Sequence, residues 1–90
     1  MMILSYEEQL LALIDERIEQ ASEDELFAGG YLRGHISLAA AECEEQGIED
    51  VKVWQAKVDQ SLEAARTELS PLDRLLVAEF WQELRQAAAL

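Results

Sequence analysis

Ninety residues with a mass of 10.2 kDa limit this chain to a single small domain. Half of the residues are apolar, which is enough to build a core and argues against a disordered chain. Nineteen acidic residues against seven basic ones give a net charge of −12, and 13 of the acids lie in the first 50 residues. Such a field repels phosphates and anionic lipid headgroups, so it disfavours binding to nucleic acids and to membrane surfaces.

A capping box opens the first predicted helix, at residues 5–21. Ser5 is followed three residues later by Glu8, a spacing at which each side chain bonds the other residue's backbone N–H. One side of this helix is acidic, whereas the other side is apolar at helical spacing. The apolar set is Leu10, Leu11, Ile14, Ile18 and Ala21.

Three further helices are predicted from similar signals, and they span residues 23–46, 50–68 and 71–88. Ser22 and Glu25 form a second capping box, and Gly47 is a typical helix stop. Ser70 and Pro71 mark the start of the last helix, because proline at the first helical position loses no hydrogen bond. Short connections between four amphipathic helices predict an all-α fold, an antiparallel four-helix bundle.

The predicted helix 23–46 is unusual because it has two apolar faces. The first face carries Phe27, Tyr31, Leu38 and Ala41. The nearly opposite face carries Leu32, Ile36, Ala39, Ala40 and Cys43. A helix that is apolar on two sides needs two partners, so we expect a neighbouring helix on each side. The alternative is that another chain covers one of the two faces.

Three glycines lie inside this helix, and each costs roughly 0.8–1 kcal/mol relative to alanine. Gly30 and Gly34 belong to a stripe of small side chains, which predicts close packing against another helix backbone. A break at Gly29-Gly30, and a ligand pressed against the bare backbone, are the two alternatives.

The segment around these glycines is distinctive. Its sequence, DELFAGGYLRGH at residues 24–35, resembles the signature segment of the YfcL-like family of small bacterial proteins. The likeness extends over nearly the whole chain and includes residues 11–15, 60–63 and 68–71, together with Asp73 and Trp81. The resemblance implies a helical fold and supplies no catalytic residue.

Catalytic chemistry finds little support in the sequence. His35 is the one histidine, and a catalytic base needs a nucleophile and an orienting group beside it. Ser37 points to another face of the helix, and Glu42 lies two turns from His35, about 10.5 Å along the axis, so neither is in place. Cys43 lies between two glutamates near the negative end of a helix, which favours the neutral thiol. Leu32 stands three residues before His35, so the Glu-x-x-His motif of dimetal bundles is missing, and we expect neither a metal nor a cofactor.

Two groups of side chains are candidate binding residues. Arg33 has no acid three or four residues away, so it either bridges to the acids of the first helix or joins Tyr31 and His35 in a recognition patch. Trp81 lies at the edge of the apolar stripe of the last helix, with Arg85 one turn on. This pair is either packing at the rim of the core or an interface anchor, and Arg85 is placed to stack on Trp81.

We therefore expect residues 1–90 to form a non-enzymatic protein-binding or adaptor module whose partner is basic. One alternative is a small accessory enzyme that uses His35 with a carboxylate from another helix, and another is a self-associating structural protein. A single cysteine, the acidic N-terminal segment and the lack of a long apolar run indicate a soluble cytoplasmic protein. We expect a monomer, with a homodimer as the alternative.

Overall fold

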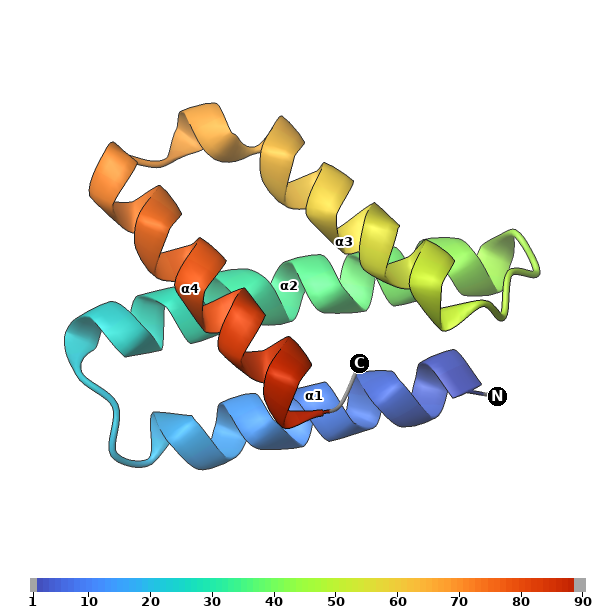
Figure 1. Cartoon of the computed structure of the whole chain (residues 1–90), viewed down its shortest axis with the longest axis horizontal. Coiled ribbons are helices and arrows are strands. Elements are labelled where there is room, and N and C mark those ends of the chain that lie inside the picture. Colours follow the sequence, from blue (N-terminus) through green and yellow to red (C-terminus); the bar gives the residue numbers. More distant parts are fainter. Residues whose placement is uncertain (1, 89–90) are drawn as a thin grey trace.

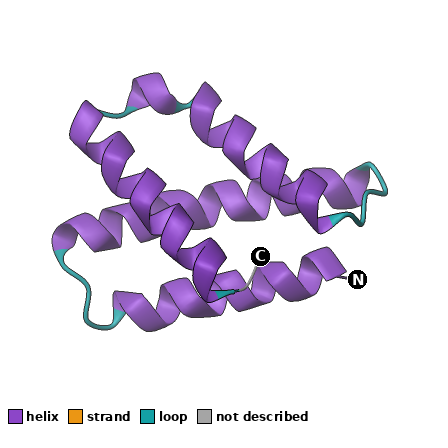
Figure 2. Cartoon of the chain, viewed as in Figure 1, coloured by secondary structure: helices purple, strands orange, loops and turns teal. Residues whose placement is uncertain are grey.

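The computed structural model describes residues 2–88, and the side chains of Met2 and Leu4 lie outside the description. These residues form four α-helices and one short 3-10 helix, with no strand among them (Figures 1 and 2). In chain order the elements are α1 (Met2–Ile18), α2 (Glu23–Glu45), α3 (Val51–Ala64), η1 (Arg66–Glu68) and α4 (Pro71–Ala87). The predicted all-α fold with four helices is confirmed.

Local capping signals explain where α2 and α4 begin. The Ser22 hydroxyl accepts a hydrogen bond from the Glu25 N–H, and the Glu25 carboxylate accepts one from the Ser22 N–H, so the predicted capping box is present. Ser70 caps α4, and Pro71 occupies its first turn. Gly47 has a φ of 71°, a left-handed conformation that glycine adopts at low cost and that ends α2 as expected.

The predicted start of the first helix is wrong. α1 begins at Met2, so Ser5 lies inside the helix, and α1 ends at Ile18 rather than at residue 21. Ile3 is buried at 3% exposure and belongs to the main core, so packing extends the helix beyond the local cap signal. The third helix is also shorter than the predicted range 50–68, because the chain tightens into η1 after Ala65.

α2 is the central helix of the bundle. It packs against α1, α3 and α4, whereas the backbones of α3 and α4 lie apart from each other and are joined through η1 (Figure 1). α1 and α2 run antiparallel side by side, and α4 crosses α2 obliquely (Figure 1). The core between these helices contains large, fully buried side chains, among them Leu10, Ile14, Leu32, Ile36, Trp54 and Leu84.

Candidate functional site

The expected recognition patch of Tyr31, Arg33 and His35 does not form as one surface. Arg33 turns toward α1, where its Nη2 donates to Asp15 Oδ2 at 3.2 Å. This is the bridge to the acids of the first helix that the sequence offered as one alternative. His35 turns toward α3 instead, because residues two apart on a helix point about 200° away from each other.

Tyr31 and His35 form a small aromatic group with their neighbours. The Tyr31 ring stacks on Phe27 at a centroid distance of 5.9 Å and meets the edge of His35 at 4.6 Å. The Tyr31 hydroxyl is buried and has no hydrogen-bond partner among the described residues. Burial, with a smaller contribution from the charge of Glu68, raises the pKa of this phenol, so Tyr31 stays neutral at physiological pH.

His35 is paired with a hydroxyl rather than with a carboxylate. Its Nδ1 lies 2.5 Å from the Oγ of Ser61 on α3. Within residues 2–88, no carboxylate is hydrogen-bonded or ion-paired to His35, so the interhelical acid that the accessory-enzyme alternative requires is not in place. The contact links α2 to α3. Among the described residues, no carboxylate is bonded to the His35 ring to orient it as in a catalytic triad.

Cys43 lies in the core of the bundle and is fully buried. Burial raises the pKa of its thiol, Glu42 adds to that effect, and Lys57 opposes it. The neutral thiol is therefore the favoured form, which agrees with the expectation from its position near the end of α2.

Trp81 and Arg85 connect α4 to α3 through one carboxylate. The Trp81 N–H donates to Asp59 Oδ1 at 2.8 Å, and Arg85 Nη1 lies 3.9 Å from Asp59 Oδ2. The Arg85 guanidinium lies 5.7 Å from the centre of the Trp81 ring, which is the stacking that the sequence spacing predicted. Because Trp81 is only 3% exposed, the geometry favours its packing role, and a binding role for this pair stays a prediction.

The close packing predicted for Gly30 and Gly34 of α2 is found at Gly29 instead. A Cβ built on Gly30 or on Gly34 meets nothing within 4 Å, so neither residue packs closely against another helix of this chain. The close approach falls on Gly29 instead, where a Cβ would lie 3.3 Å from Ile14 Cγ2 on α1. The helix continues through Gly29-Gly30 without a break. Gly29 faces α1 and Gly30 does not, because consecutive residues of a helix point about 100° apart around its axis.

One of the two apolar faces of α2 is only partly covered by the other helices. The face of Leu32, Ile36 and Cys43 is buried as predicted. On the other face Tyr31 packs against the core, but Phe27 is 40% and Leu38 is 54% exposed, so neighbouring helices cover this side only in part and not fully as expected. We name this surface the exposed α2 face; its residues are Phe27, Gly30, Gly34, Leu38 and Ala41, all exposed to solvent.

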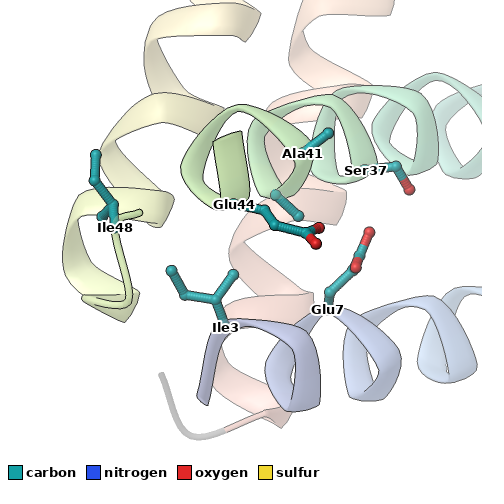
Figure 3. A pocket seen from close by; sticks show the side chains of 7 residues that line it. Ile3, Glu7, Ser37, Ala41, Glu44 and Ile48 are labelled. Carbon is teal, nitrogen blue, oxygen red and sulfur yellow. The ribbon is translucent and has the colours of Figure 1, made fainter. Parts of the chain in front are cut away.

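A hollow of about 180 Å³ adjoins the exposed α2 face at Ala41. It lies between the start of α1 and the end of α2, and Figure 3 shows the carboxylates of Glu7 and Glu44 pointing into the same space beside Ser37. Ile3 and Ile48 provide an apolar floor. Sequence reasoning missed this hollow, because Glu7 and Glu44 meet only through the antiparallel register of two helices.

Comparison with known proteins identifies the group to which the chain belongs. A family model described as YfcL protein matches residues 4–86. The uncharacterized protein YfcL of Escherichia coli (strain K12) is 48% identical over 90 residues, which cover 98% of this chain and 98% of that protein. The chain belongs to the YfcL family. No solved structure matches this YfcL family member.

The family match spans the whole exposed α2 face and every residue that lines the hollow except Ile3. Residues 4–86 include the whole of α2, together with Glu7 of α1. None of the helices described for this YfcL family member has both the length and the apolar character that crossing a membrane requires. The surface to be explained is the second apolar face of α2 and the acidic hollow beside it.

Proposed function

We propose that this YfcL family member is a non-enzymatic, cytoplasmic protein-binding module that docks its partner on the exposed α2 face. The observation that carries the proposal is that this face remains open although α2 is the central helix of the bundle. Phe27 and Leu38 present apolar side chains to water, with the bare backbone of two glycines between them. Exposed apolar patches on small soluble proteins are typical of interaction surfaces.

The two glycines strengthen this reasoning. Gly30 and Gly34 weaken the helix, yet the packing of their own chain gives no reason for a missing Cβ at either position. A helix surface without side chains allows another backbone to approach closely. The proposed partner supplies the packing that the fold itself does not use.

Self-association is the competing explanation of the same face. Both ends of α2 are acidic, with residues 23–25 at its start and Glu42, Glu44 and Glu45 at its end. A second copy of α2 therefore brings like charges together in both the parallel and the antiparallel arrangement. Electrostatics favours a different protein as the partner, and we propose that the chain itself is monomeric.

Photocrosslinking in the native bacterial cell tests the proposed docking surface. A photoreactive phenylalanine analogue replaces Leu38 in one variant and Leu75 in another; each of these leucines is 54% exposed, but Leu75 lies on α4. We expect position 38 to give a covalent adduct with a second protein, identified by mass spectrometry, and position 75 to give none. Adducts with another copy of the chain support self-association instead, and identical patterns or no adduct from position 38 refute the proposal.

A further inference from the structure

We infer that the partner on the exposed α2 face is an amphipathic helix of another protein, with an apolar stripe of small side chains and a lysine at one end. This inference rests on the proposed function and adds the chemistry of the partner.

The shape of the exposed α2 face fits a rod. Gly30 and Gly34 lie one turn apart and form a shallow notch, and Phe27 and Leu38 rise on either side of it along the helix. A partner helix that crosses at the notch contacts the bare backbone there and packs its own apolar side chains against the two flanking residues. From Phe27 to Ala41 the face extends about 21 Å, which a helix of roughly 14 residues matches.

The charge around the exposed α2 face favours a positively charged partner helix. α2 carries six acidic residues against one arginine, and that arginine is already paired with Asp15 of α1. The acids lie at the two ends of the helix, so the apolar face is bordered by negative charge at both ends. A helix with basic residues toward its ends gains electrostatic attraction where it overlies the acidic ends of α2, and the same field steers its association.

The hollow beside Ala41 gives the position of one basic side chain. Glu7 and Glu44 contribute two carboxylates, and neither of them forms an ion pair within the part of the chain that the structure describes (Figure 3). The apolar floor of Ile3 and Ile48 suits a methylene chain, and the Ser37 hydroxyl offers a further acceptor. A lysine, with a flexible apolar stem and three donors on its ammonium group, matches this combination.

Selection from a displayed peptide library tests the inference with a defined probe. Randomised helix-forming peptides of about 18 residues are selected against the full-length protein, and the dissociation constants of the enriched peptides are measured. We expect the enriched peptides to share an apolar stripe of small side chains and a lysine beyond one end of it. Their affinity should fall as ionic strength rises, because the attraction is screened.

Four variants locate the binding. Leu38→Asp places a charge in the exposed α2 face and should weaken the selected peptides at least about tenfold, and Leu38→Ser repeats the test without a charge. Glu7→Gln removes one carboxylate from the hollow and should weaken lysine-containing peptides by about three- to tenfold. Glu8→Gln removes the same charge from an exposed neighbour that does not line the hollow, and it should change the affinity less than about twofold.

The outcomes separate the two proposals. Enriched peptides without a basic bias, or equal effects of Glu7→Gln and Glu8→Gln, overturn the lysine-bearing partner while loss of binding in the Leu38 variants still supports docking on the face. Binding that survives both Leu38 substitutions overturns the proposed docking surface as well. A library that yields no binder, or sedimentation that shows a dimer of the chain alone, overturns the inference in favour of another occupant.

Discussion

Replacing Gly30 and Gly34 by alanine should stabilise the fold. Alanine is favoured over glycine in a helix interior by about 0.8–1 kcal/mol, and a Cβ at either position meets no atom within 4 Å. The gain should therefore appear without strain, and the double variant should gain about 1.6–2 kcal/mol in its free energy of unfolding. For a domain of this size, that corresponds to a rise in Tm of roughly 6–16 °C.

Thermal and urea unfolding, followed by far-ultraviolet circular dichroism, measure the effect. Two other glycines of the chain provide controls. Gly29→Ala places its Cβ 3.3 Å from Ile14 Cγ2, so the gain should be smaller there or absent. Gly47→Ala forces an alanine into a φ of 71° and should lower stability by about 1 kcal/mol. The reasoning is refuted if the Gly30 and Gly34 variants are destabilised, or if all four positions respond alike.

Further substitutions test one contact between α3 and α4 and two buried polar groups. Trp81→Phe removes the hydrogen bond to Asp59 and should cost about 1–2 kcal/mol in chemical unfolding. The same change in an Asp59→Ala background, which has no side-chain acceptor, should cost clearly less, and equal costs contradict a coupling between the two side chains. Tyr31→Phe removes a buried hydroxyl that has no partner among the described residues, so stability should stay the same or rise by up to about 1 kcal/mol, and a loss of that size contradicts the assignment. Burial raises the pKa of Cys43, so the thiol ionises more readily in the unfolded chain than in the fold. The stability contributed by the neutral thiol should be complete below the unfolded pKa of about 8.5 and should decline as the pH rises above it, with a flatter profile in Cys43→Ala.

The sequence predicted those features of the fold that depend on neighbouring residues. The Ser22–Glu25 capping box, the Ser70-Pro71 start and the stop at Gly47 each involve residues at most three positions apart, and all three are present. The capping signal at Ser5 has the same local form, yet α1 extends past it. Burial of Ile3 in the assembled core outweighs the cap there, and its place seven residues before Leu10, on the same side of the helix, is the sign of that burial in the sequence.

The candidate site was only half predictable for a related reason. Helical periodicity identified both apolar faces of α2 but could not decide which of them three other helices would cover. That choice depends on the angles at which α1, α3 and α4 cross α2. The same limit applies to the hollow, where 37 positions of sequence separate Glu7 from Glu44 and only the pairing of α1 with α2 brings them together.

The stability and the binding of this protein make opposite demands on Gly30 and Gly34. If the glycines have no role in binding, alanine at both positions should improve stability and leave peptide affinity unchanged. If they leave room for a partner helix, the same two methyl groups should stabilise the free protein and weaken the complex, because they project into the notch where the backbones meet. Two changes of opposite sign from one pair of substitutions are difficult to explain by a merely structural role, so this comparison connects the geometry of α2 most directly to its proposed function.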